Sequence, residues 1–359
     1  MFVGVDLHKK MAVYTAVDDE GTVIGEGATE NTVLGWQKFG QLFPPGTSVA
    51  LEACVNWGQV CDALEAQGLR PALANSKRVR MIAESKSKTD RIDSQILAQL
   101  LRTQFLPQVH IPSAEVRRLR ELLSYRWSLG KTAGEIKSRI HGLLIKEWVE
   151  VPERLFYGPG KQWLADVELP PPSRMMLDGL LERLRCVEDE QTRCQALFAQ
   201  RAREDERVLR LMEIRGVDYY TALIIVSWID DIHRFPTWRK LAAYIGVVPS
   251  SRSSAETAYH GHITKEGPAI LRWAVTECIR YVVAENPKLR NALERIGRRR
   301  GKGIARVAVA RRLVRILYHM LKDGTHYDYL TERTYRRKLK EMEVEARRYT
   351  LPSRNASRS

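Results

Sequence analysis

Short apolar runs separated by turn residues occupy the first hundred residues. Three β-rich runs lie within residues 2–30 and predict an antiparallel meander. Further apolar strands are expected at 48–53 and 70–76, and helical patterns come after the meander and after each of these strands. Strands that alternate with helices after a meander predict an α/β domain with a mixed sheet.

The period of the apolar positions changes after residue 106. From Leu119 to Leu143, and again from Leu177 to Phe198, the apolar spacing alternates between three and four residues. This is the period of a coiled-coil seam, although two ordinary amphipathic helices within one domain would share it. We expect two long helices joined by a segment that Gly and Pro keep irregular, forming a helical coiled-coil insertion that contacts another subunit.

Helical patterns dominate from residue 205 onward. A tight turn at Gly216 between two helices resembles the helix-hairpin-helix module that binds phosphate backbones, except that Asp218 replaces the usual second glycine. Gly, Pro and five small hydroxyl residues predict a flexible loop before a helix that starts near Pro268. We therefore expect a mainly α-helical C-terminal domain. The proposed division of the chain is 1–106, 107–204, 205–325 and a basic helical tail at 326–359 whose end is disordered.

The charge of the chain narrows the kinds of function that we expect. The chain has 58 Lys and Arg against 43 Asp and Glu, a formal net charge of +15, which favours a polyanionic partner. No apolar run approaches the ~20 residues that cross a bilayer, and no signal peptide is recognisable. The five cysteines form no CxxC pair, so we expect reduced core thiols in a cytoplasmic, nucleoid-associated protein without a membrane partner.

Four carboxylates are candidates for chemistry. Asp90 and Asp93 stand three residues apart at the start of a helical pattern, so they share one face of that helix. A helix start capped by Thr89 explains these two acids equally well. Asp6 and Glu52, however, end buried strands, where α/β folds place functional groups. If the four converge, they need hard cations such as Mg²⁺ or Mn²⁺, and two such ions about 4 Å apart suit phosphodiester chemistry.

Basic residues predict contacts to phosphate. A run around Gly301 holds four cations that have no acid beside them, and we interpret them as phosphate contacts, the alternative being a solvated charge run. These are Arg298, Arg299, Arg300 and Lys302. Lys265 precedes the free N–H groups of the helix near Pro268, and together they form a second candidate phosphate site. His260 and His262 are expected to have structural or phosphate-contacting roles.

The motifs GVDLHKK, ALEA and KTDRID resemble the acidic tetrad of RuvC-like (RNase H-type) domains in the DEDD-type insertion-sequence transposases, a group that includes the Piv invertases. GVVPSSRSS and GHITKEGP are similar to the serine-bearing transposase domain of the same family. The chain departs from the family pattern at Cys54, Ser94 and Ala255, none of which replaces a carboxylate.

The resemblance implies specific roles. Asp6, Glu52, Asp90 and Asp93 would be catalytic and bind Mg²⁺ or Mn²⁺. Ser254 would be the nucleophile that forms a covalent phosphoserine–DNA intermediate, with Ser250 and Ser251 as alternative assignments. Donor and target DNA, a structured bridge RNA and a dimeric or tetrameric synapse would be the partners. Two other hypotheses stay open: a metal-dependent junction nuclease that uses water, and a non-catalytic nucleic-acid-binding derivative.

Overall fold

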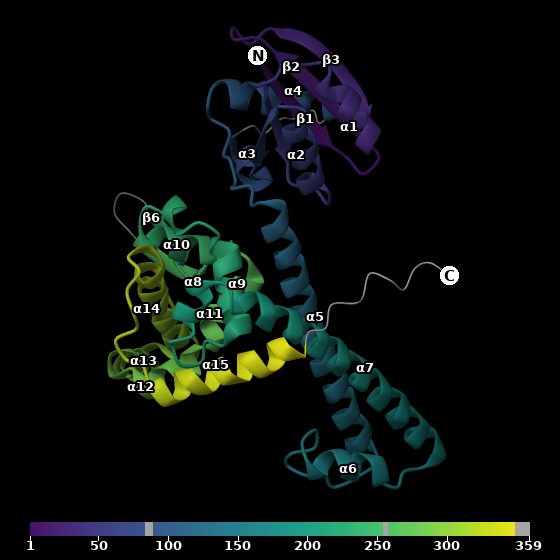
Figure 1. Ribbon diagram of the computed structural model, residues 1–359, viewed down its shortest axis with the longest axis vertical. Helices are drawn as coiled ribbons and strands as arrows, with labels where there is room; N and C mark the ends of the chain where they lie inside the picture. The colour runs from purple at the N-terminus through teal and green to yellow at the C-terminus, as the bar shows by residue number, and fades with distance from the viewer. Residues whose placement is uncertain (83–88, 254–257, 349–359) are drawn as a thin grey trace. The chain divides into compact units, whose positions relative to one another are not determined.

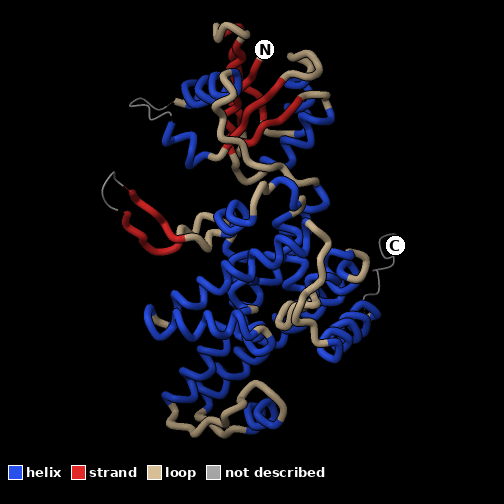
Figure 2. Tube along the Cα trace, turned by 90° about the vertical axis from the view of Figure 1, so that its left-hand side faces the viewer, coloured by secondary structure: helices blue, strands red, loops and turns tan. Residues whose placement is uncertain are grey.

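The computed structural model describes residues 1–82, 89–253 and 258–348, and the chain forms two compact units, Met1–Arg117 and Arg118–Ser359. Unit 1 contains a five-stranded sheet in the order β3-β2-β1-β4-β5 (Figure 2). The strands are β1 (Phe2–Leu7), β2 (Met11–Val17), β3 (Val23–Glu30), β4 (Ser48–Glu52) and β5 (Arg70–Ala74). β1, β2 and β3 pair antiparallel, whereas β4 pairs parallel with β1 and with β5. The predicted mixed sheet that begins with a meander is confirmed.

Helices cover both faces of this sheet. Buried side chains along its central strands point alternately to one face and to the other, so apolar residues on both faces are covered. Val49 and Leu51 of β4 pack with the core beneath the first pair of helices, whereas Ala50 packs with the core beneath the second pair. The first pair is α1 (Val33–Gly40) and α2 (Trp57–Ala66); the second is α3 (Ser76–Ile82) and α4 (Asp90–Arg102). The face covered by α4 is the one that matters for the candidate site.

Three helices begin the helical part of the chain: α5 (Ala114–Lys146), α6 (Pro159–Asp166) and α7 (Pro171–Ala202). The two long helices predicted from the apolar spacing are present, and Ile140 and Leu144 of α5 share a core with Leu177 and Leu184 of α7. α6 was not predicted, because the Gly and Pro content of this segment indicated an irregular connection. Pro159 instead occupies the first turn of α6, where a missing N–H costs nothing.

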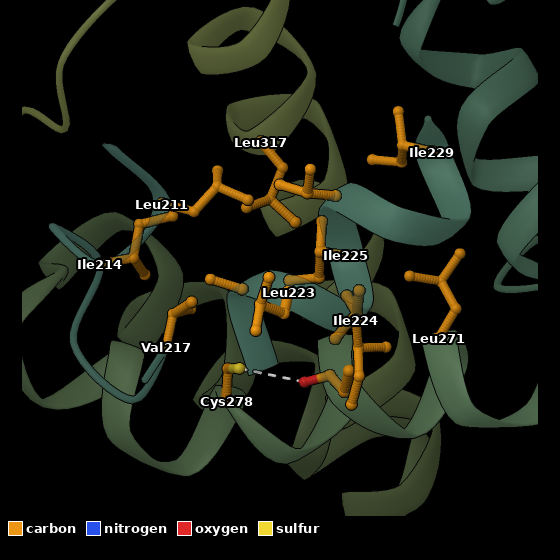
Figure 3. Close-up of a cluster of buried hydrophobic side chains, with 14 of the residues drawn as sticks. Leu211, Ile214, Val217, Leu223, Ile224, Ile225, Ile229, Leu271, Cys278 and Leu317 are labelled. Atoms are coloured by element: carbon orange, nitrogen blue, oxygen red, sulfur yellow. Dashed lines mark hydrogen bonds between the residues drawn. The ribbon is translucent and has the colours of Figure 1, made fainter. Parts of the chain in front are cut away.

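The rest of unit 2 packs around one buried helix, α9 (Tyr219–Ile229), in which every residue from Tyr220 onward is buried. Figure 3 shows side chains of α9 between Leu271 and Leu317, which come from α11 and α14. The helices that build this core are listed here: α8 (Glu206–Leu211), α10 (Trp238–Ile245), α11 (Ala269–Glu277), α12 (Ile279–Glu285), α13 (Pro287–Arg300), α14 (Lys302–Lys322) and α15 (Glu332–Arg347).

The turn between α8 and α9 is held from inside the protein. Gly216 adopts a φ of +86°, and a Cβ there would lie 2.6 Å from the Cβ of Tyr281. The ammonium of Lys338, on α15, donates hydrogen bonds to the carbonyls of Met212, Ile214 and Val217. The helix–turn–helix predicted around Gly216 is therefore present. The Asp218 carboxylate accepts the Thr221 N–H at 2.8 Å, so this helix start is capped by the chain itself, where the module that it resembles would receive a phosphate.

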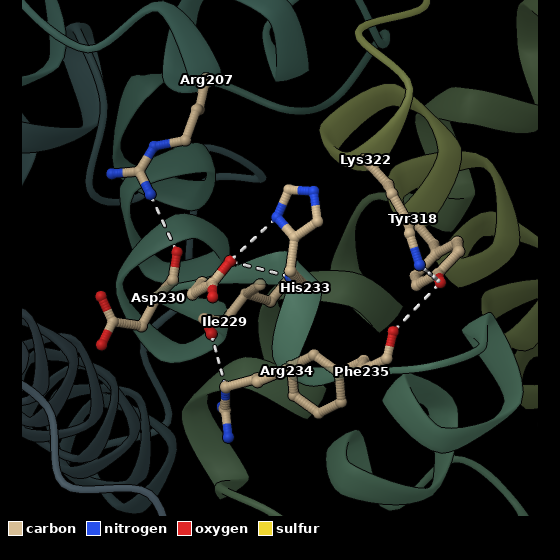
Figure 4. A network of polar contacts seen from close by, with 9 residues as sticks. Arg207, Ile229, Asp230, His233, Arg234, Phe235, Tyr318 and Lys322 are labelled. Carbon is tan, nitrogen blue, oxygen red and sulfur yellow. Dashed lines mark hydrogen bonds and ion pairs between the residues drawn. The ribbon is translucent and has the colours of Figure 1, made fainter.

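Polar contacts also fasten the connection between α9 and α10, which contains the short 3₁₀ helix η1 (Ile232–Arg234) (Figure 4). The Arg234 guanidinium donates to the Ile229 carbonyl at 2.8 Å. From α14, the Tyr318 hydroxyl donates to the Phe235 carbonyl at 3.1 Å and accepts from Lys322 at 2.7 Å. α10 is thereby anchored to α14.

The prediction of a flexible loop before Pro268 is only partly correct. Residues Pro249–Ser253 form β6 and Ala258–Ile263 form β7, paired antiparallel as a hairpin. The serine content suggested a loop, whereas the backbone pairs Ser251 with His260, Arg252 with Tyr259 and Ser253 with Ala258. Among the described residues, no helix is long and apolar enough to span a bilayer. All five cysteines are free, and Cys186 is exposed rather than in the core.

Candidate active site

Two of the predicted carboxylates come from neighbouring strand ends. β1 and β4 are adjacent and parallel, with Val5 paired to Leu51, so the next residue of each strand, Asp6 or Glu52, lies at the same edge of the sheet. Because the buried side chains of each strand alternate, both carboxylates project toward the face that α4 covers. The Asp6 side chain is 17% exposed.

The other two carboxylates stand on the first turn of α4. Thr89 caps the helix by accepting the Ile92 N–H at 3.3 Å, which confirms the predicted cap. Asp90 and Asp93 both belong to this turn, where the helix dipole favours anions. The capping interpretation is thus correct but does not exclude chemistry, because it places both carboxylates at the end of the helix that reaches the sheet edge.

Close packing fixes α4 against β1. A Cβ added to Gly4 would lie 2.0 Å from the Ser94 carbonyl oxygen and 2.4 Å from the Ala98 nitrogen, so only glycine permits this approach. In the same layer, the Thr15 and Ser94 hydroxyls form a buried hydrogen bond of 2.8 Å. Ser94, one of the departures from the family pattern, therefore has a partner on β2. These contacts set the height of α4 over the sheet.

The electrostatics indicate that the four carboxylates gather. Burial raises the pKa of Asp6, the neighbouring His8 lowers it, and the negative charges of Asp90, Asp93 and Glu52 raise it further. Each of the other three carboxylates thus acts on Asp6 through space. A cation placed among them would relieve this repulsion.

His8 is a site residue that the sequence analysis missed. Its Nε2 atom lies 3.1 Å from the Asp6 carboxylate and 3.2 Å from the Asp90 carboxylate. The potential ligand atoms of these three side chains all lie within 4.8 Å of one another. The imidazole nitrogen thus contacts both carboxylates at once. The available signal was the alternation along β1, which puts residues two apart on one face of a strand.

The donor set suits a hard divalent cation. Four carboxylates offer the oxygen ligands that Mg²⁺ and Mn²⁺ prefer, and an imidazole nitrogen beside them is a ligand that suits transition metals better than Mg²⁺. The crowding of like charges around the half-buried Asp6 is the structural observation that fits such an ion. Asp6, Glu52, Asp90 and Asp93 are the residues that would hold it.

Two family models match the chain over these regions. A transposase model of the IS110 DEDD type matches residues 3–148, which include all four carboxylates. A second model, described as the transposase IS116/IS110/IS902 family, matches residues 208–294.

The chain is also similar to known transposases over most of its length. It is 27% identical over 335 residues to the transposase for insertion sequence element IS1111A of Coxiella burnetii, covering 89% of each chain. It is 25% identical to a probable family 20 transposase of Pseudomonas aeruginosa, covering 90% of this chain and 98% of the relative. The chain belongs to the DEDD-type insertion-sequence transposases. It is thus a DNA strand-cleaving and rejoining enzyme.

The predicted nucleophile of this transposase, Ser254, lies outside the described residues. The structure describes the backbone of the strands before and after it, β6 and β7, and places Ser250 on β6 as an exposed residue. The assignment of Ser254 stays a prediction, as do the roles of the four carboxylates.

The predicted phosphate contacts of the transposase are all exposed. Arg298, Arg299 and Arg300 form the last turn of α13, where cations also complement the helix dipole, and Lys302 opens α14 beyond Gly301, whose φ is +85°. Lys265 has a positive φ of 52° in the turn before α11. Arg300 lines the large cleft of unit 2 described below, whereas the other four do not.

Proposed function

We propose that this transposase excises and integrates an insertion sequence through a metal-bound carboxylate site and a serine nucleophile. The observation that carries the proposal is the cluster of Asp6, His8 and Asp90, whose potential ligand atoms all lie within 4.8 Å of one another. The charges of Asp90, Asp93 and Glu52 act in the same place, since they help burial to raise the pKa of Asp6. Four carboxylates held this close are unfavourable without a cation, and a DNA-cleaving enzyme has a use for one. The match of residues 208–294 to a transposase family supports a second functional region that includes Ser254.

The carboxylates have a holding and orienting role in this proposal. Asp6 and Glu52 are fixed by the pairing of β1 with β4, and Asp90 and Asp93 by the packing of α4 on Gly4. When bound, Mg²⁺ or Mn²⁺ would stabilise charge on the attacking and leaving oxygens of a phosphodiester. His8, between Asp6 and Asp90, orients these two side chains.

The serine step conserves the energy of the phosphodiester bond. The Ser254 Oγ attacks the phosphorus, its proton passes to solvent, and an Oγ–P bond forms. The P–O bond to one deoxyribose breaks, and the leaving oxygen takes up a proton. Attack on the phosphoserine by a hydroxyl of a second DNA end then restores a phosphodiester and the free serine.

The decisive experiment looks for this adduct. Wild-type enzyme with Mn²⁺ and DNA that carries the ends of the element should give a protein–DNA species that survives denaturation. Ser254→Ala should abolish both the adduct and cleavage, whereas the matched variants Ser250→Ala and Ser251→Ala should retain both. Cleavage by Ser254→Ala without an adduct would instead favour the junction nuclease that uses water.

The non-catalytic alternative predicts a different result. If the chain only binds nucleic acid, Asp90→Asn should leave every measurable behaviour unchanged. We expect this variant to bind DNA normally and to lose recombination, because no tetrad position is replaced in this chain.

The guide RNA and the oligomer are also proposals. The family resemblance suggests a structured bridge RNA, and the net charge of +15 is compatible with RNA as well as DNA. A dimer or tetramer through the α5–α7 insertion is supported by exposed apolar side chains near its tip, of which Trp148 is 96% exposed and Met175 72%. Sequencing of RNA that copurifies with the enzyme, and its mass in solution with and without Trp148→Glu, test the two proposals separately.

A further inference from the structure

Unit 2 contains a cleft of about 1700 Å³. One wall is a face of α14, and others come from α13, the start of α10 and the segment 325–329. At its edge lie Pro249 and Ile263, which pair with each other at the base of the β6–β7 hairpin. The cleft therefore adjoins the β6–β7 hairpin, and Ser254 directly follows β6 in the sequence.

α14 presents two different faces. Val309, Leu313 and Leu317 are fully or almost fully buried in the core of the unit. The face toward the cleft carries cations at Arg311 and Arg315, four residues or about 6 Å apart along the helix, and a third at Arg312. The sequence analysis overlooked this stripe because the same helix also shows a strong apolar pattern.

These cations are not neutralised within the protein. Lys288, Arg300, Arg312 and Arg315 are exposed, and none of them forms an ion pair among the residues that the structure describes. Asp328 is the one acid in the cleft lining. A concentration of unpaired positive charge in a concave surface attracts a polyanion.

The cleft is also lined by apolar and aromatic side chains, which bear on whether a duplex or a single strand would bind there. The Arg311 guanidinium lies 5.5 Å from the centre of the half-buried Trp238 ring, and Tyr329 is a second aromatic residue that lines the cleft. Ile304, which also lines the cleft, is 55% exposed. A duplex hides its bases and presents phosphates, whereas a single strand offers unpaired bases that stack on aromatic and apolar side chains.

We propose that this cleft binds a segment of single-stranded DNA. Arg311, Arg312 and Arg315 contact its phosphates and Trp238 stacks on a base. The inference rests on the proposed function in one respect, since DNA rather than RNA is chosen because the cleft adjoins the hairpin of the DNA-attacking serine. In this proposal the cleft holds the DNA strand that separates from its complementary strand near the bond that is cleaved.

The test measures binding without cleavage, so that it does not depend on the serine mechanism. In a Ser254→Ala background, fluorescence anisotropy with a labelled single-stranded DNA of about 12 nucleotides is compared with RNA of the same sequence and with the DNA duplex. Arg312→Gln with Arg315→Gln should weaken single-stranded DNA binding about tenfold and reduce the slope of log K against log salt by about 1.4, the value for two lost phosphates. Trp238→Ala should weaken binding about tenfold with the slope unchanged.

A matched pair controls for charge. Arg183→Gln with Arg333→Gln removes two exposed arginines that lie outside the cleft, and this pair should leave affinity and slope unchanged. Circular dichroism melts confirm that each variant is folded. Equal losses in the two arginine pairs, an unchanged slope in Arg312→Gln with Arg315→Gln, or tighter binding of RNA or duplex than of single-stranded DNA would each overturn the proposal.

Discussion

The acidic site of unit 1 and the basic cleft of unit 2 gather charge in opposite ways. In unit 1, backbone pairing brings carboxylates together at neighbouring strand ends, and their repulsion contributes to the raised pKa of Asp6. In unit 2, one face of α14 and the segments beside it leave arginines unpaired within the described residues. We propose a small cation for the first arrangement and a long anion for the second. A transposase needs both, since it must activate one phosphate and hold many.

The largest effect is expected from removing one carboxylate of the acidic site. Asp6→Asn should slow DNA cleavage by about 10³-fold or more, because a half-buried carboxylate that we propose as a metal ligand loses its charge, while single-stranded DNA binding stays unchanged. Strand-cleavage rates measured alongside anisotropy separate the two effects. Glu20→Gln, at an exposed position between β2 and β3, is the control. A parallel loss of binding and cleavage would mean that the two charge clusters are not independent.

The geometry of the acidic site depends on one glycine. Gly4→Ala should destabilise unit 1 by about 3 kcal/mol, since its Cβ would overlap the backbone of α4 and force the helix off β1. Urea denaturation monitored by unit 1 tryptophans measures this change. Gly134→Ala, in α5 with no atom within 4 Å of the added Cβ, should instead stabilise its helix by about 0.5–1 kcal/mol. Equal tolerance at both positions would show that α4 is not fixed by contact with β1.

Not every cation of unit 2 is free for a ligand, and Lys338 shows the contrast. Burial lowers its pKa to about 8, below its value in the unfolded chain. Between these two pKa values the unfolded state binds more protons, so the stability of unit 2 should rise as the pH rises from about 8 to about 10.4. Lys338→Met should remove this rise and cost about 2 kcal/mol, because carbonyls lose their donor. Thermal melts across this pH range, with Lys340→Met as the exposed control, measure both effects.

The smallest effect concerns the hydroxyl pair beneath the acidic site. Ser94→Ala should cost about 1 kcal/mol, because the buried Thr15 hydroxyl loses its partner. The double variant Thr15→Val with Ser94→Ala should recover most of that loss, since no polar group is then left unpaired. A double-mutant cycle by urea denaturation gives the coupling. Additive losses would mean that the pair does not couple α4 to β2.

Much of unit 1 could be predicted from sequence, because its strands and helices follow from the spacing of apolar residues within short segments. The alternation in β1 and β4 located Asp6 and Glu52 at strand ends, and the pattern after Thr89 located the helix of Asp90 and Asp93. His8 was missed because the predicted site was built from carboxylates alone, although its spacing of two residues from Asp6 was visible in the sequence.

Unit 2 was less predictable, since its cleft is formed by residues that are distant in sequence. Arg311 lies against Trp238 only in the folded chain, since Trp238 is 73 positions earlier in the sequence. The β6–β7 hairpin was missed for a related reason, because composition describes single residues whereas a hairpin depends on which residues face each other. Local charge runs pointed to Arg300, but not to the arginines of α14.

The Lys338 contacts have a consequence for the synthesis of the protein. Met212 precedes Lys338 by 126 residues, so the carbonyls of the turn before α9 leave the ribosome long before their donor is made. At about 5–20 residues per second, this interval lasts roughly 6–25 s. During that time the nascent helical unit lacks the hydrogen bonds that Lys338 donates to this turn. We expect chaperones to bind ribosome-bound chains that end between these two residues, and to release them once α15 has emerged.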